Sequence, residues 1–420
     1  MPGNSALSCS SRVAGLSGAG ENQDMRKKTM TRKVLLAATI LMTPWASEAQ
    51  TTARLDLDWQ AVAGKILERL ALEPGARVLL VARPGMFDAL IPHLRYAVAE
   101  AGGTDLGVID VLATPLPTSL DQEALARSNR DARESYRRMF RDVDAAVMLP
   151  GASTNDAAYM AMQDLLHEGQ GRTIHFHWLE NGSVYPVPGQ PLPPLNVVDA
   201  TYQRALLETD YAALGRIQRR FERAMRGGSE VRVTTAAGTD LRFSIGDRPV
   251  NRQDGDASAA RTDRGLILID REIELPAGAI RVAPLEETVQ GTIVFPPSQW
   301  SDRPVSGLTL TIENGVVVDV AAESGLDAAL AEMDAAGTPG RRFREFALGF
   351  NPLLAVPDRR PWVPYYGYGA GVVRLSLGDN SELGGTVTGG YVRWNFFTDA
   401  TVTVGEDVWV REGRLTPPAN

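Results

Sequence analysis

Between residues 58 and 206, short apolar runs alternate with helical stretches, and this alternation constrains the fold most. The apolar runs have the length of buried strands and lie at residues 78–81, 106–111, 145–149 and 174–178. The stretches with apolar residues at helical spacing are 59–70, 86–101 and 121–140. Apolar strands joined by amphipathic helices are typical of a mostly parallel sheet with helices on both faces. We therefore predict an N-terminal α/β domain over residues 50–206.

The pattern changes in the second half of the chain. A proline-rich stretch at residues 186–194 predicts a linker, and residues 210–226 predict an amphipathic helix closed by two glycines. From residue 231 onward, short strands joined by tight turns predominate, and Asn314-Gly315 is typical of a two-residue β-hairpin. We predict a second, β-rich domain over residues 207–420, so the fold class is α/β with a β-rich C-terminal domain.

Residues 30–49 have the pattern of a signal peptide. Arg32 and Lys33 precede an apolar run at 34–42, and small residues follow at Ser47 and Ala49. The apolar run is too short for a permanent membrane span. We predict translation from Met30, with residues 1–29 as an upstream extension, and a periplasmic or secreted protein.

Charge and histidine content narrow the functional classes. The net charge of −8 argues against a nucleic-acid partner, which requires a basic face. Of the four histidines, His175 and His177 lie on one face of a predicted strand. The pair either supplies two metal ligands, with Asp164, His167 or Glu180 as a companion, or packs as ordinary polar residues. The sequence contains no nucleophile elbow, Walker motif or dinucleotide fingerprint.

Several stretches of the second half follow one another in a known order and spacing. They are VRVTTAAGTDLRFS at residues 231–244, QGTIVF at 290–295, 308–315, REFALGFNP at 344–352, 371–378 and 384–394. Together they resemble the metallo-aminopeptidase family of aminopeptidases T and S, the thermophilic metalloproteases. The resemblance implies an aminopeptidase-like C-terminal domain and a homodimer. It also implies two divalent metal ions that activate water against the peptide bond at a free N-terminus.

The positions of the family's metal ligands are largely changed in this chain. The family stretch P-x-G-E-V-F-T-x-P aligns with residues 276–284, so Ala279 takes the place of its carboxylate. Glu345 retains the second carboxylate, whereas Arg374 replaces a histidine. Arg393 and Asn395 replace the histidine and aspartate of the family's H-W-D stretch.

Arginine stays protonated at ordinary pH and cannot bind a metal. The family's tyrosine falls at Asn380 or Ser381, and Glu286 and Glu287 are nearby carboxylates that could replace the missing one. We therefore predict a degenerate metal site that holds no metal cofactor.

The altered site predicts a different ligand. Arg374 and Arg393 are expected to project into the former metal cavity beside Glu345, and the strand period of two puts Arg281 on the face of Ala279. Such an arginine-rich, net positive pocket suits a carboxylate or phosphate. The alternative is an internal ion pair that fills the cavity. The predicted ligand-binding residues are Arg374, Arg393, Asn395, Tyr368 and Arg281.

Three hypotheses for function follow. The first is an exported family member that binds a small anionic or peptide-like ligand, with catalysis doubtful. The second is a hydrolase with a rebuilt site, in which Glu345 is the general base and arginines stabilise an oxyanion. The third is a non-catalytic dimeric interaction protein. The aromatic residues between 362 and 397 either line a ligand pocket or pack in the core and at a dimer interface.

Overall fold

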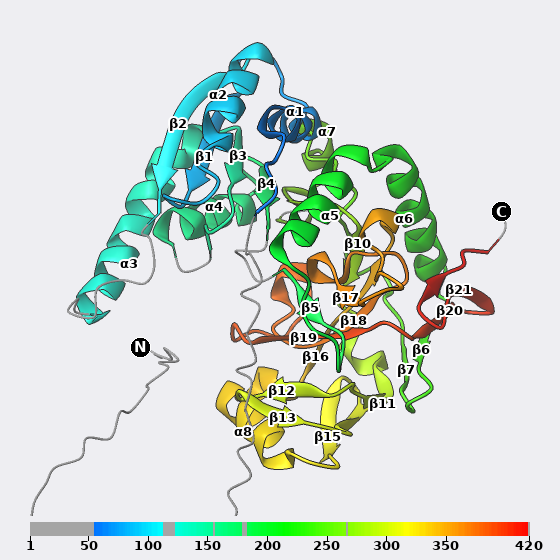
Figure 1. The fold of residues 1–420 in the computed structure, drawn as a ribbon. Coiled ribbons are helices and arrows are strands. Elements are labelled where there is room, and N and C mark those ends of the chain that lie inside the picture. Colours follow the sequence, from blue (N-terminus) through cyan, green and yellow to red (C-terminus); the bar gives the residue numbers. More distant parts are fainter. Residues whose placement is uncertain (1–53, 112–121, 154–155, 179–182, 266–267, 419–420) are drawn as a thin grey trace, which may run out of the picture. The chain divides into compact units, whose positions relative to one another are not determined.

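A parallel sheet organises the first half of the structure, a computed structural model that describes residues 54–111, 122–153, 156–178, 183–265 and 268–418. Its strands lie in the order β2-β1-β3-β4-β9, and every neighbouring pair is parallel. They are β1 (Arg77–Ala82), β2 (Thr104–Asp110), β3 (Ala145–Met148), β4 (Thr173–Phe176) and β9 (Glu272–Leu275). We call this sheet A (Figure 1).

The alternation of side chains along β1 explains why helices cover both faces of sheet A. Val78 and Leu80 pack in one core cluster with residues of α1 (Trp59–Leu70) and α2 (Leu90–Glu100). Leu79 and Val81 pack in a second cluster with residues of α4 (Ala157–His167). A strand buried on both faces reads as a continuous apolar run, as predicted for this segment.

The second half is built from two further sheets. Sheet C has the order β15-β14-β11-β7-β6-β20-β21-β22, and sheet D has the order β19-β18-β16-β10-β8. The strands of sheet C are β6 (Val231–Thr234), β7 (Asp240–Phe243), β11 (Gln290–Val294), β14 (Thr309–Glu313), β15 (Val316–Ala321), β20 (Thr401–Val404), β21 (Asp407–Arg411) and β22 (Arg414–Leu415). The strands of sheet D are β8 (Asn251–Arg252), β10 (Ala279–Val282), β16 (Phe343–Gly349), β18 (Val373–Gly378) and β19 (Val392–Phe397).

Aromatic side chains join these two sheets to a helix. Phe243 of β7 and Phe346 of β16 have ring centres 5.2 Å apart. Phe221 of α6 (Tyr211–Arg226) lies 6.3 Å from Phe346 and 4.9 Å from Trp409 of β21. The other helices are α3 (Gln122–Met139), α5 (Leu195–Glu208), α7 (Ala259–Thr262) and α8 (Leu326–Ala336). Two short pairs, β5 (Tyr185–Pro186) with β17 (Trp362–Val363) and β12 (Ser298–Trp300) with β13 (Arg303–Val305), complete the described strands.

The predicted fold class is confirmed, with differences of detail. Helix α2 begins at Leu90 and not at residue 86, because Phe87 has a positive φ of 57° and the Asp88 carboxylate accepts from the backbone N–H of Gly85 at 3.1 Å. Helices α4 and α5 were not predicted. Strand β9 belongs to the C-terminal segment but completes sheet A, so the two predicted domains share one sheet within the compact unit Gln50–Asn420.

The predicted signal peptide and upstream extension lie outside the described residues. Among the helices that the structure does describe, none is long and apolar enough to cross a membrane.

Candidate functional site

Strand register brings the predicted residues of sheet D to one face around Glu345. Ala347, two residues further along β16, lies opposite Arg281 of β10 on one side and Arg374 of β18 on the other. Residues opposite one another in antiparallel strands share a face, and residues two apart on one strand share it too. Arg281 and Arg374 therefore flank the small Ala347 and reach toward the carboxylate of Glu345.

The Glu345 carboxylate is fully buried and surrounded by guanidinium groups. Oε1 lies 2.8 Å from Nη2 of Arg374 and accepts from the Ser376 hydroxyl at 3.3 Å. Oε2 accepts from Nη2 of Arg281 at 3.2 Å and from Nη1 of Arg344 at 3.2 Å. A register shift between Phe343 and Glu345 accounts for the position of Arg344, since a bulge redirects the side chain of a strand residue.

These charges determine the protonation state of Glu345. Burial alone would raise the pKa of this carboxyl, but the positive charges of Arg374, Arg281 and Arg344 outweigh burial and hold the pKa well below its ordinary value. A carboxylate of this kind is a weak proton acceptor. The arrangement therefore disfavours the predicted role of Glu345 as a general base.

Further carboxylates balance the arginines. Glu382, in the short 3-10 helix η8 (Ser381–Leu383), accepts from Arg344 at 2.5 Å and also from Arg281. Glu274 of β9 lies 3.8 Å from Arg281 and accepts a hydrogen bond from the Tyr368 hydroxyl. The expectation of a net positive cavity is wrong, because three carboxylates face three guanidiniums, and the predicted alternative of an internal ion pair describes the geometry.

Two predicted site residues lie elsewhere. Arg393 is opposite Leu377 in the register and Asn395 is opposite Leu375, whereas Arg374 is opposite Phe396. Arg393 and Asn395 therefore leave β19 on the face opposite to Arg374. Arg393 binds Glu332 of α8 at 3.0 Å and stacks at 3.9 Å over the ring of Trp300. The expectation that Arg393 and Asn395 join Arg374 beside Glu345 is wrong.

On the face of sheet D that carries Arg374, aromatic residues occupy the place that was expected for Arg393 and Asn395. The guanidinium carbon of Arg374 lies 5.0 Å from the ring centre of Trp394 and 5.9 Å from that of Tyr368. Nη1 of Arg374 also donates to the carbonyl oxygen of Tyr366 at 3.0 Å. Tyr366 and Tyr368 are buried in the loop between β17 and β18.

Comparisons with known proteins fit this architecture. Residues 215–353 match the sequence model of the family described as thermophilic metalloprotease (M29). Over these residues the chain is similar to the M29 family. The resemblance stated from the sequence is thus confirmed, and no curated protein matches the chain.

Two solved structures share the fold. The 2,5-dihydroxypyridine dioxygenase from Pseudomonas putida KT2440 has a TM-score of 0.59 at 14% identity, over 86% of this chain and 97% of that one. Wild-type AmpT from Thermus thermophilus has a TM-score of 0.56 at 17% identity, over 85% of this chain and 99% of that one. At such identities the likeness shows the fold alone, and one fold supports different chemistries.

The donor set does not fit the two metal ions that the resemblance to the M29 family implies. Glu345 is already bound by three guanidiniums, and Ala279 offers no donor atom. Glu286 does not replace the missing carboxylate, because its Oε1 accepts from Asn380 at 3.0 Å and from the Thr386 backbone at 2.8 Å. In the part of the chain that the structure describes, no group of three or more His, Cys, Asp or Glu side chains is placed to hold a metal ion.

A second polar group, missed in the sequence, surrounds Glu272 of β9. Its Oε1 lies 3.0 Å from Nδ1 of His175, accepts from Gln163 at 2.7 Å and lies 3.2 Å from the Tyr159 hydroxyl. Burial, and then the charge of Glu382, raise the pKa of Glu272 to about 7. Burial lowers the pKa of His175 to about 4, so the imidazole is neutral at neutral pH and its close contact with Glu272 is a hydrogen bond and not an ion pair.

A sequence signal for this group did exist. Glu272-Ile-Glu274-Leu alternates polar and apolar residues, as His175-x-His177 does on β4. The two strands pair in parallel with His175 opposite Glu274, which puts both polar rows on one face. His175 and His177 have ring centres 3.9 Å apart and serve here in polar packing, one of the two predicted roles.

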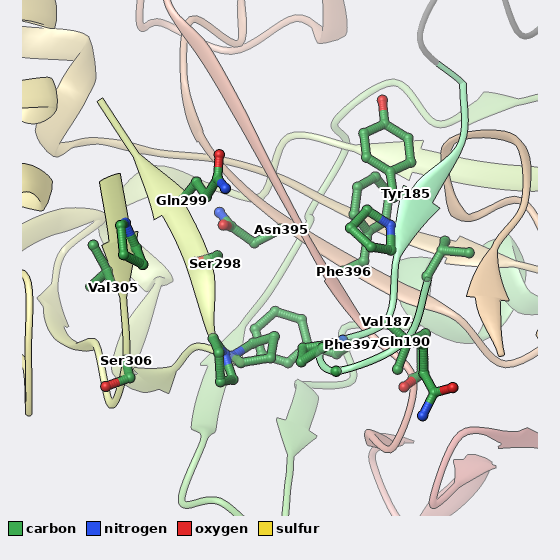
Figure 2. Close-up of a pocket in the computed structure, with 18 of the residues that line it drawn as sticks. Tyr185, Val187, Gln190, Ser298, Gln299, Val305, Ser306, Asn395, Phe396 and Phe397 are labelled. Carbon is green, nitrogen blue, oxygen red and sulfur yellow. The ribbon is translucent and has the colours of Figure 1, made fainter. Parts of the chain in front are cut away.

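A pocket of about 810 Å³ lies along β19. It is lined by the β5 strand with the following loop, by residues 296–299 and 304–306, and by residues 393–399. Figure 2 shows Asn395 directed toward Gln299 and Phe396 lying beside Tyr185. The rings of Tyr185 and Phe396 have centres 4.3 Å apart. The predicted ligand residues Arg393 and Asn395 therefore line this pocket and not the cavity around Glu345.

Proposed function

We propose that this chain is an exported M29-family protein that binds a peptide-like ligand and carries out no two-metal hydrolysis. One observation carries the proposal: the surviving family carboxylate, Glu345, is saturated by Arg281, Arg344 and Arg374. A metal ion would have to displace these guanidiniums and would meet their charge. Glu345 and these three arginines thus form a closed ionic cluster that supports the fold, and binding is left to the pocket along β19.

The pocket along β19 suits an extended peptide. In the described part of the chain β19 is an edge strand that pairs with β18 alone, and an edge strand presents unpaired backbone N–H and C=O groups. A peptide can add to such an edge as a further strand. The opposite walls contain prolines, which offer apolar surface without a backbone donor, and the stacked Tyr185 and Phe396 offer a face for a side chain.

The charge of the pocket favours a peptide-like ligand over a small anion. Arg393, the arginine that lines it, is already paired with Glu332 and donates to the carbonyl oxygen of Gln299 at 2.5 Å. Its charge is therefore largely compensated. Close to Arg393 lie the neutral side chains of Ser298, Gln299 and Asn395, which suit peptide amides. The pocket is also lined by the exposed Asp399, whose negative charge disfavours an anion.

The proposal is tested with the mature protein in two steps. Metal content is measured after incubation with zinc, cobalt or manganese and desalting, and we expect less than one ion per chain. Calorimetric titration with uncharged tripeptides then compares the wild type with Phe396→Ala, which should bind about 10-fold or more weakly because a large apolar contact is lost.

The matched control is Tyr96→Ala, an exposed aromatic residue of α2 that should leave peptide affinity unchanged. One or two tightly held ions per chain would overturn the metal-free part of the proposal. Equal affinity of Phe396→Ala and the wild type would overturn the assignment of the pocket.

A second candidate function is metal-independent acid–base hydrolysis at Glu272. The observation that favours it is a carboxyl group with a pKa of about 7, close to the value that proton transfer at neutral pH requires. Glu272 lines a small polar cleft together with Glu274, Arg281 and Glu382. This candidate replaces Glu345 as the catalytic carboxyl in the rebuilt-hydrolase hypothesis.

Turnover of amino-acid and peptide anilides in the presence of a chelator tests this candidate. If Glu272 acts as a general base, the rate should rise with pH through about 7 and fall about 100-fold or more in Glu272→Gln. Glu287→Gln, an exposed glutamate, is the control. Absence of turnover, or an undiminished rate in Glu272→Gln, rules the candidate out.

A further inference from the structure

A polar cavity lies at the amino edge of sheet A, apart from both sites described above. The residues that immediately precede parallel strands meet at one edge of the sheet. Here these residues are Ala76 before β1, Asp144 before β3, Arg172 before β4 and Arg271 before β9. All four line one cavity of about 340 Å³.

Arg172 carries a buried charge without a partner. Its residue is 6% exposed, and its Nε and Nη2 atoms are buried with no hydrogen-bond partner among the described residues. In the same described ranges, no carboxylate lies within 4.0 Å of its guanidinium. An unpaired buried charge is costly, and proteins as a rule pair such a group or place it where a ligand pairs it. Burial also lowers the pKa of Arg172, although the charges of Glu73 and Asp144 oppose this effect.

A second arginine points to the same cavity. The backbone N–H of Thr173 donates to the carbonyl oxygen of Arg271 at 2.6 Å, which holds the residues before β4 and β9 side by side. Nη1 of Arg271 donates to the carbonyl oxygen of Gly171 at 2.8 Å, and its Nε is buried without a partner. Arg271 likewise has no carboxylate within ion-pair distance in the ranges that the structure covers.

The carboxylates at the rim do not neutralise this pair. Asp144 already accepts from Arg77 through the backbone N–H at 2.7 Å, Nε at 3.0 Å and Nη2 at 3.2 Å. Glu73 is exposed at the mouth. Two guanidiniums with free donors in a largely polar cavity are what a phosphate or carboxylate group requires.

We propose that Arg172 and Arg271 form an oxyanion-binding site for a small ligand that carries a phosphate or carboxylate group. The cavity lies within the range of about 300–1,000 Å³ that small-molecule sites occupy, so it accommodates more than a bare ion. The site is independent of the ionic cluster around Glu345 and of the pocket along β19.

Unfolding at equilibrium tests the site. The mature protein is titrated with inorganic phosphate, sulfate or citrate at constant ionic strength set with potassium chloride, and the midpoint of unfolding is followed. At least one oxyanion should stabilise the wild type in a saturable manner, because a ligand that binds only the folded state shifts the equilibrium. Comparison of phosphate with citrate shows which group the site prefers.

Arg172→Met and Arg271→Met should each weaken the apparent affinity by about 10-fold or more, since each removes a charge-assisted donor. In chloride alone, Arg172→Met should be at least as stable as the wild type, because an apolar side chain replaces an unpaired buried charge. If Arg172 instead served to stabilise the fold, Arg172→Met would be less stable than the wild type in chloride. If Arg172→Met fails to fold, the half-buried Arg271 supplies the decisive variant.

The control is Arg95→Met. Arg95 is an exposed arginine of α2 that pairs with Asp105 of β2 at 2.6 Å, and this variant should be stabilised by the oxyanions as the wild type is. No stabilisation beyond that of chloride, or equal stabilisation in Arg172→Met and Arg271→Met, would overturn the proposal.

Discussion

A carboxylate that accepts from several guanidiniums is a strong acid and a weak base, whereas a buried carboxyl group among neutral partners is a weak acid. This chain places one of each near Arg281, which pairs with Glu345 at 3.2 Å and lines one small cleft with Glu272. Glu345 has a pKa well below its ordinary value, and Glu272 has a pKa raised to about 7. The two residues therefore differ in what they can do. Glu345 anchors arginines, and Glu272 can exchange a proton near neutral pH.

The raised pKa of Glu272 predicts how stability depends on pH. The folded state binds this proton more tightly than the unfolded state, so the stabilisation is complete below about pH 4.5 and is lost as the pH rises through about 7. In Glu272→Gln the side chain stays neutral, so the free energy of unfolding of this variant should fall less than that of the wild type between pH 5 and 8. The two falls should differ by at most about 3 kcal/mol. Urea unfolding at several pH values measures this difference.

His175 acts with the opposite sign, because its lowered pKa gives stability above about pH 6.5 that is lost as the pH falls toward 4. For this reason the comparison is made between variants and not from the wild type alone. Glu287→Gln should give a curve parallel to the wild type. A parallel curve for Glu272→Gln as well would mean that its carboxyl has an ordinary pKa in the folded protein.

At the level of single residues, the sequence predicted part of the site. Glu345, Arg374 and Arg281 were placed together because the strand period of two and the family alignment agree, and the register confirms that they share a face. Arg393 was misplaced, because a one-residue difference in register moves a side chain to the other face and nothing in the local sequence fixes that register. Glu272 was missed because its partners come from α4 and β4, far away in the chain.

Among the elements, those with strong local signals were predicted well. Helix α1 has the predicted bounds, since periodicity and turns mark both of its ends, and β6 begins at residue 231, where the predicted β-rich pattern starts. Helix α6 begins after Asp210, whose side chain accepts from the backbone N–H of Ala213 at 2.8 Å and caps the helix. Helix α4 is buried on much of its surface, so its sequence lacks the polar stripe that marks an amphipathic helix.

The hairpin between β14 and β15 gives a prediction for a single element. Gly315 has a φ of 74°, and a Cβ atom at this position would lie 2.7 Å from the carbonyl oxygen of Glu286. Gly315→Ala should lower the free energy of unfolding by more than the roughly 1–2 kcal/mol that a left-handed conformation costs a residue with a side chain. Chemical denaturation measures the loss.

Gly189→Ala is the matched control, because Gly189 has a similar φ of 76° with open space around it. This variant should show the conformational cost alone. Equal losses for the two variants would mean that the backbone at Glu286 moves freely, and that the hairpin is not held against it.

For the whole molecule, the sequence predicted the order of an α/β part and a β-rich part but not their connection. Strand β9 lies between β8 and β10 of the second part in sequence, yet it pairs with β4 as the outer strand of sheet A. Its buried residues, Ile273 and Leu275, read as an ordinary short strand. A long-range pairing of this kind depends on the whole arrangement of the chain, which local patterns do not contain.

The shared strand predicts that both parts of the molecule lose stability together. Ile273 is fully buried in the core cluster that also contains Val147 of β3 and Leu241 of β7. Ile273→Ala should lower the free energy of unfolding by about 2–5 kcal/mol because it leaves a cavity. Hydrogen exchange followed by mass spectrometry should show equal losses of protection in β3 and in β7, since both open in one cooperative unit. Val318→Ala, at a half-exposed position of β15, should change neither. A loss confined to β3 would show instead that sheet A unfolds on its own, and that β9 belongs energetically to the first part of the chain.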